Sequence, residues 1–227
     1  ISFTVNGLME KFGGTAGNIA YALSLLEEKP RILATIGHDH QRYSQWLEHN
    51  GIATEDIRII PEEFTASAYI TTDLAENQIT AFNPGAMKHP SACDLAGIDP
   101  AGCIAIVAPG NLQDMAEYTR SYQELGIFAI FDPGQSLPAW DGDALASSIG
   151  RSKMLVSNDY ELGMIKSQTG LSAEQISGMV ETIVTTKSEQ GCEVLTRAGA
   201  VSIPVVPTGN AVDPTGAGDA FRGGLIK

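Results

Sequence analysis

One run of residues toward the C-terminal end has the residue types and the spacing that anion chemistry needs. It reads VDPTGAGDAFRGGL over residues 212–225. Gly216 and Gly218 let backbone N–H groups turn toward one point, and the first turn of a helix leaves such groups unpaired. Asp219 follows Gly216 by about one helical turn, so its carboxylate can face the same space. The run predicts an anion site beside a base that takes a proton from a hydroxyl attacking phosphate.

Other readings of this run are weaker. An ordinary turn before a closely packed helix is the structural alternative. No Gly-x-x-x-x-Gly-Lys-Ser/Thr run occurs in the sequence, which excludes a P-loop nucleotide site. Phe221 stands where a dinucleotide fingerprint needs its third glycine, which argues against a Rossmann site.

The composition limits the classes of partner. The chain has 227 residues and a net charge of -13, which disfavours nucleic-acid polymers and anionic membrane surfaces. No apolar run reaches transmembrane length. The cysteines are 3 in number and scattered, as expected of reduced thiols in a cytoplasm. We therefore expect a cytoplasmic protein that acts on a small molecule.

The elements that must position the anion site alternate between short apolar runs and amphipathic stretches. This alternation predicts a mainly parallel sheet covered by helices. Strands are expected at residues 31–36, 104–108, 128–132 and 154–157, with a strand pair at 193–197 and 201–205. Helices are expected at residues 16–26, 41–50, 113–125, 138–149, 160–168 and 173–187.

One segment breaks the alternation. Residues 57–60, 68–72 and 78–82 read as consecutive strands with no helix between them. Such strands cannot join a parallel sheet through right-handed crossovers, so we expect a separate small antiparallel sheet. Residues 2–5 are a candidate further strand of it.

Two motifs give the chain a family resemblance. The string Asp213-x-Thr215-Gly216-Ala217-Gly218-Asp219 resembles the signature of ribokinase-like kinases of sugars and nucleosides, the phosphofructokinase-B type. FGGTAGNIA over residues 12–20 is similar to the first signature of that family. The resemblance implies an α/β, three-layer ribokinase-like domain with a central mainly parallel sheet plus a small antiparallel β-sheet lid. It assigns residues 13–56 and 84–227 to the kinase domain, and residues 1–12 and 57–83 to the lid.

The resemblance also assigns roles near the acceptor. Gly13, Gly14 and Asn18 are expected to bind a sugar hydroxyl, since an amide both donates and accepts hydrogen bonds. Asp132 is a second candidate because it ends a strand, where α/β sheets place ligands. Asp219 is the expected base, and the N–H groups of residues 216–218 (Gly216, Ala217, Gly218) are expected to hold the transferring phosphoryl group.

On the nucleotide side, Asn158 and Glu161 have the spacing of a capping box. They also resemble an Asn-x-x-Glu element of the family that organises Mg²⁺ through bound water. The resemblance assigns nucleotide contacts to Asn158, Thr186, Gly191, Asp213 and Thr215. Ser188 replaces a glycine that many family members have beside the nucleotide; a serine fits that place without strain only if its φ is negative, and otherwise the loop lies differently against the nucleotide.

The function that follows is an ATP- and Mg²⁺-dependent kinase, with adenosine the expected acceptor. Ribokinase or fructokinase activity is the runner-up. A non-catalytic binding relative, or a subunit that only dimerises through the lid, is disfavoured by Asp219 and the anion site. Complete members of the family extend further at both ends, so we expect this sequence to be a fragment; a homodimer through the lid is also expected.

Overall fold

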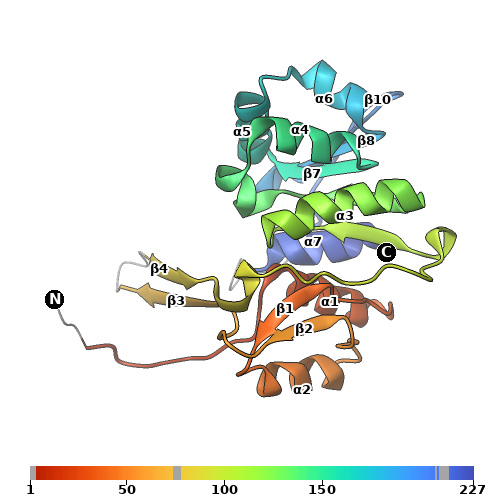
Figure 1. The fold of residues 1–227 in the computed structure, drawn as a ribbon. Helices are drawn as coiled ribbons and strands as arrows, with labels where there is room; N and C mark the ends of the chain where they lie inside the picture. Colours follow the sequence, from red (N-terminus) through yellow and green to blue (C-terminus); the bar gives the residue numbers. More distant parts are fainter. Residues whose placement is uncertain (1–3, 74–77, 208, 210–214) are drawn as a thin grey trace.

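A sheet of six strands forms the centre of the molecule. The computed structural model describes residues 4–73, 78–207, 209 and 215–227 (Figure 1). The sheet has the order β10-β9-β8-β7-β6-β5. Strands β5 to β8 run parallel, and β9 is antiparallel to both of its neighbours. The bounds are β5 Ile104–Val107, β6 Phe128–Phe131, β7 Met154–Asn158, β8 Thr182–Thr186, β9 Cys192–Thr196 and β10 Gly199–Ile203.

Both faces of this sheet are covered, which gives three layers. Successive side chains of a strand point to opposite faces. Phe131 and Leu155 therefore pack in the core on one face, whereas their neighbours Ile130 and Val156 pack on the other. The first face carries the helices α3 Leu112–Leu125, α4 Gly142–Gly150, α5 Asp159–Thr169 and α6 Ala173–Met179. The second face is covered by α7 Ala217–Ile226, which contributes Phe221.

A second parallel unit lies beside the sheet. Strands β1 Ala34–Gly37 and β2 Ile57–Ile60 pair in parallel, with helix α2 Gln41–His49 between them. The prediction that residues 57–60 belong to an antiparallel sheet is therefore wrong, because α2 provides the crossover that joins parallel strands. Helix α1 Thr15–Leu25 packs against this unit through Ala20.

The small antiparallel sheet has two strands, β3 Ser67–Thr72 and β4 Gln78–Asn83. This hairpin extends away from the body of the molecule on the same side as the N-terminal segment (Figure 1). Thr4 and Val5 are not in a strand, and the rest of the predicted strand at residues 2–5 lies outside the described residues. Short 3₁₀ helices are η1 Gly85–Lys88, η2 Pro100–Gly102, η3 Gly134–Ala139 and η4 Ser188–Gln190.

Two predicted helices are wrong in extent. The helix expected at residues 173–187 is α6 followed by strand β8. The run from Thr182 to Thr186 consists of β-branched residues, which favour a strand over a helix. The helix expected from residue 138 begins later, because Asp141 caps α4 by accepting hydrogen bonds from the N–H groups of Asp143 and Ala144. Within the described ranges, no helix combines the length and apolar character that a membrane crossing requires.

Helices α1 and α7 approach each other unusually closely at one glycine. Gly223 is buried, and a Cβ added there would lie only 2.6 Å from the Cβ of Ala22. No side chain fits between the two helices at this point. Gly224, the next residue, has nothing within 4 Å of an added Cβ.

These neighbouring glycines give a matched test of the packing. Gly224→Ala should stabilise the protein by up to about 1 kcal/mol, because alanine is the better helix former. Gly223→Ala should instead lower the free energy of unfolding, since overpacking costs about 1–3 kcal/mol. Urea denaturation of both variants measures the difference. Equal changes in the two variants would contradict the close approach.

Candidate functional site

The helices α1 and α7 begin in the same uncapped way. Each starts after a glycine in the left-handed region, Gly14 with φ 89 and Gly216 with φ 78, and neither has a side-chain cap. Most of the other helices are capped by a side chain, namely α3, α4, α5 and α6 by Asn111, Asp141, Asn158 and Ser172. The first N–H groups of α1 and α7 therefore lie at the positive ends of the helix dipoles without a side-chain cap, and their binding of a ligand remains a prediction.

A hydrogen bond joins the two predicted motifs at these helix starts. Asn18 Nδ2 donates to Asp219 Oδ2 over 2.8 Å. The glycines lie around this bond: an added Cβ would lie 3.8 Å from the Asn18 amide at both Gly13 and Gly216. Residues predicted from two distant parts of the sequence thus come together in one place. Gly216 has the positive φ, whereas Gly218 lies inside α7.

An arginine links the Asp219 carboxylate to a second, buried one. Arg222 Nη1 donates to Asp219 Oδ1 over 3.0 Å, and Arg222 Nε donates to Asp132 Oδ2. The Asp132 side chain is 0% exposed and that of Arg222 15%. Burial raises the pKa of Asp132 to about 6, although the Arg222 guanidinium acts in the opposite direction.

Sequence reasoning gave Arg222 no role. A signal was present, because a residue three positions after Asp219 on a helix lies beside it. The buried position of Asp132 gives it a partner within the protein, and its contact with a substrate remains a prediction.

Asn158 and Glu161 form the capping box. Asn158 Oδ1 accepts from the Glu161 N–H over 2.7 Å, and Glu161 Oε2 accepts from the Asn158 N–H over 2.8 Å. The charge of Glu161 also acts on Asp132 and Arg222, raising the pKa of both. The carboxylate and amide oxygens suit Mg²⁺. Among the described residues, no group of three acidic, histidine or cysteine side chains could ligate a metal ion directly. Cation binding by Asn158 and Glu161 through water remains a prediction.

The predicted nucleotide residues lie at the ends of adjacent strands. Thr186 ends β8 directly opposite Asn158, which ends β7. Gly191 has φ 85, and a Cβ there would lie 2.0 Å from the Ile203 carbonyl oxygen. Ser188 does not meet the condition of a negative φ: its φ is 51, so this serine takes a left-handed conformation that a glycine would adopt without strain.

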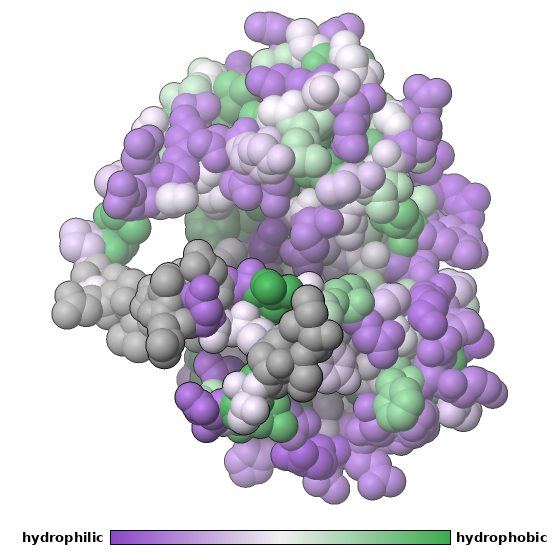
Figure 2. All heavy atoms as spheres, turned by 90° about the vertical axis from the view of Figure 1, so that its left-hand side faces the viewer, coloured by the Kyte–Doolittle hydropathy of each residue, from purple (hydrophilic) through white to green (hydrophobic). Residues whose placement is uncertain are grey.

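Thr215 is exposed in the turn before α7, and Asp213 lies outside the described residues. Nucleotide contacts of Thr186, Gly191 and Thr215 remain predictions. On the side from which the hairpin extends, the molecular surface is hollowed, and hydrophilic residues lie at the back of the hollow (Figure 2).

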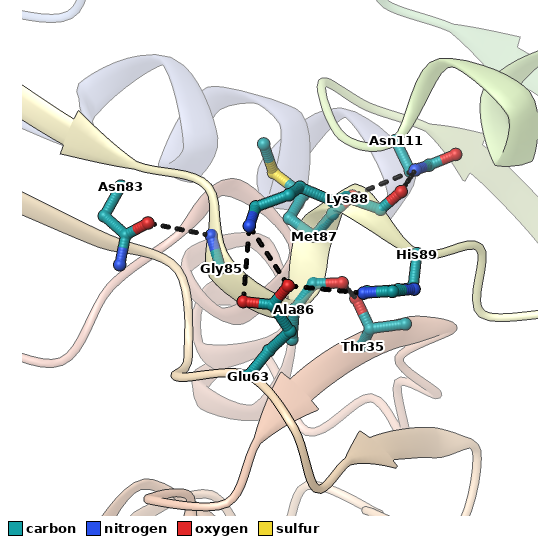
Figure 3. A network of polar contacts seen from close by, with 9 residues as sticks. All are labelled: Thr35, Glu63, Asn83, Gly85, Ala86, Met87, Lys88, His89 and Asn111. Atoms are coloured by element: carbon teal, nitrogen blue, oxygen red, sulfur yellow. Dashed lines mark hydrogen bonds and ion pairs between the residues drawn. The ribbon is translucent and has the colours of Figure 1, made fainter.

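The base of the hairpin is held by polar contacts on both of its connecting segments. Lys88 and His89 pair with Glu63, and the Ala86 carbonyl oxygen accepts from Thr35 Oγ1 (Figure 3). An added Cβ at Gly85 would lie 2.1 Å from the Phe64 carbonyl oxygen, so the two segments cross in direct contact. Further bonds come from Asn111 Nδ2 to the carbonyl oxygens of Met87 and Lys88, and from the Gly85 N–H to Asn83 Oδ1.

Comparison with known proteins shows the family of this chain. Residues 2–227 match the model described as pfkB family carbohydrate kinase. A nucleoside kinase of Methanocaldococcus jannaschii is 27% identical over 228 residues, which is 100% of this chain and 74% of the relative. An ATP-dependent ribose-1-phosphate kinase of Halopiger xanaduensis is 31% identical over 221 residues, 94% of this chain and 72% of the relative.

Solved structures agree with this match. The nucleoside kinase of Burkholderia thailandensis in complex with inosine superposes with a TM-score of 0.90 at 42% identity, covering 100% of this chain and 74% of that one. The M. jannaschii nucleoside kinase superposes with a TM-score of 0.92 at 26% identity, covering 100% and 75%. The predicted three-layer fold with a small antiparallel sheet is confirmed.

The buried carboxyl of Asp132 should make stability depend on pH. Its pKa is raised from 3.8 to about 6, so the folded protein binds more protons there than the unfolded chain between these values. The contribution of Asp132 to the free energy of unfolding has its full value below about pH 4 and is lost as the pH rises to about 6. Relative to Asp132→Asn, the wild type should lose at most about 1.4 kcal/mol per pH unit in this window.

Urea unfolding of the wild type and Asp132→Asn from pH 4 to pH 7 measures this loss, with the exposed Asp143→Asn as the control. A stability difference between wild type and Asp132→Asn that stays constant over this range would contradict the assignment.

Proposed function

Because the chain belongs to the pfkB family of carbohydrate kinases and is an ATP-dependent kinase of a sugar or nucleoside, we propose that its acceptor is a nucleoside, with adenosine the first candidate. The hydrogen bond between Asn18 and Asp219 carries the phosphoryl-transfer part of this proposal. It places a group that can bind a hydroxyl beside a carboxylate that can take its proton. Both lie at the start of a helix that can hold phosphate.

The proposed reaction uses groups of this chain. Asn18 and the N–H groups at the start of α1 bind the acceptor hydroxyls. Asp219 takes the proton of the acceptor's hydroxymethyl group. The oxygen of that group forms a bond to the γ-phosphorus of ATP, and the bond between this phosphorus and the bridging oxygen breaks, which releases ADP. The N–H groups of Ala217, Gly218 and Asp219 precede the first one bonded in the helix, that of Ala220, and they stabilise charge on the transferring group.

We assign the Mg²⁺ role to Asn158 and Glu161, acting through bound water. When bound, the cation neutralises charge on the nucleotide phosphates. The capping box fixes the single amide oxygen of Asn158 and one carboxylate oxygen of Glu161, which holds both side chains in place at the end of β7.

Nucleoside acceptors are favoured over the alternatives by the relatives. The M. jannaschii and B. thailandensis proteins are named nucleoside kinases, and the latter was solved with inosine. A ribokinase or fructokinase activity is the second candidate, since relatives named fructokinase also match over most of the chain. A non-catalytic binder would have no use for a carboxylate held at the phosphate site.

We further propose that the hairpin β3–β4 is a lid over the acceptor. The strand at residues 57–60 belongs to the α/β body, so the lid is smaller than the predicted residues 57–83. Its apolar side chains Tyr69, Ile79 and Phe82 are exposed, and a second copy of the chain would cover them in the proposed homodimer. The contacts at Glu63 and Gly85 fix the base, so closure would start beyond them. We place the protein in the cytoplasm, a proposal supported by its three unpaired cysteines.

A panel of acceptors with Mg·ATP tests the function. We expect the highest kcat/KM with adenosine or inosine, and lower values with ribose, fructose and ribose 1-phosphate. Asp219→Asn, which keeps the shape of the side chain, should lower kcat about 10²–10⁴-fold, the usual contribution of a general base.

Two outcomes would contradict this account. Faster turnover of a sugar than of any nucleoside would favour the second candidate. An Asp219→Asn variant that retains more than about a tenth of kcat would show that Asp219 is not the base.

A further inference from the structure

Arg222 occupies a position that a structural ion pair alone does not explain. Its guanidinium bridges Asp132 and Asp219. The same group lies over the start of α7, because an added Cβ at Gly218 would lie 3.0 Å from Arg222 Nη1. A cation therefore lies beside the first turn of α7, whose N–H groups are proposed to hold the transferring phosphoryl group.

A cation at the start of α7 balances the negative charges of the carboxylates around it. Asp132, Asp219 and Glu161 all act on Arg222 and raise its pKa. A nucleotide phosphate that enters here meets three carboxylates, which repel it. A guanidinium matches phosphate oxygens with paired N–H donors and is always charged, so it can offset this repulsion.

The anchor of Arg222 is itself unusual. Asp132 is fully buried, and its Oδ1 has no hydrogen-bond partner among the described residues. Burying a carboxylate with an unpaired oxygen is costly. Such a cost is characteristic of functional sites, where a charge is held in place for a ligand.

Both carboxylate oxygens of Asp219 accept a hydrogen bond in this arrangement. Asp219 Oδ2 accepts from Asn18 and Oδ1 accepts from Arg222. A departing guanidinium would remove a donor and a positive charge from Oδ1, which makes this oxygen a better acceptor for the proton of the acceptor hydroxyl. Nucleotide binding and activation of the base would then be coupled through one side chain.

We propose that Arg222 is a further catalytic residue: held by Asp132, its guanidinium exchanges Asp219 for the γ-phosphoryl group of the bound nucleotide. The proposal rests on the proposed kinase function. As the acceptor oxygen bonds to phosphorus and the bond to ADP breaks, Arg222 stays protonated and stabilises the charge on the transferring oxygens. The hydroxyl proton passes to the freed oxygen of Asp219.

A binding experiment tests this without relying on turnover. Calorimetry compares ADP with a non-hydrolysable ATP analogue, both with Mg²⁺, on the wild type and Arg222→Gln. Because Arg222→Gln loses a charged contact to the γ-phosphate, its affinity for the ATP analogue should fall about tenfold or more. Its affinity for ADP should change about twofold at most. Arg120→Gln, at an exposed arginine of α3, is the matched control and should behave as wild type.

Arg222→Lys keeps the charge and removes the planar, forked guanidinium. It is the second variant for the test if Arg222→Gln does not fold. We expect it to fold and to weaken the analogue by an intermediate factor. With an acceptor from the panel, Arg222→Gln should also lower kcat about 10²–10³-fold with acceptor KM changed about threefold at most.

Equal affinities of the wild type and both folded variants for the ATP analogue would overturn the proposal. So would equal losses for ADP and the analogue, because Arg222 would then act on the fold or on other phosphates. Failure of the wild type to phosphorylate any acceptor would count against the kinase function instead, and the binding comparison would still decide the role of Arg222.

Discussion

The close contact of helices α1 and α7 is the constraint on which the site depends. Gly223 lets the backbones approach at Ala22, and the bond between Asn18 and Asp219 ties the two helix starts together. Because both helices begin with a left-handed glycine and neither has a side-chain cap, the contact brings the first turns of both helices to one place. An acceptor and a phosphate can then be held side by side. This geometry is what in-line transfer requires.

Electrostatics complete this arrangement. Carboxylates beside a phosphate site are unfavourable unless a cation balances them. Arg222 provides that cation from within α7, and Asp132 holds it from the sheet. The charge of Glu161, the proposed Mg²⁺ residue, also acts on Arg222 and raises its pKa. The candidate site therefore combines two parts of the fold. The helices α1 and α7 contribute N–H groups and the proposed base Asp219, and the ends of β6 and β7 contribute the carboxylates that act on Arg222.

The sequence allowed prediction where local chemistry decides the structure. The glycine-rich helix starts, the capping box at Asn158 and the hairpin near residues 67–83 follow from turn, cap and alternation patterns. Strand β8 was missed because its register is set by pairing with β7 and β9, which a local pattern does not contain. The parallel pairing of β2 was missed for the same reason. The contact between Arg222 and Asp132 joins residues that only the folded sheet brings together.

Calorimetric titration of Gly218→Val and Asn18→Ala is the most direct test of whether the start of α7 binds the nucleotide phosphate and the start of α1 binds the acceptor. A side chain at Gly218 would meet the Arg222 guanidinium, so this variant should lose about tenfold or more in affinity for an ATP analogue and retain that for adenosine. Asn18→Ala should do the reverse. If Gly218→Val stays folded and binds the analogue as the wild type does, the phosphate site lies elsewhere and the account is wrong.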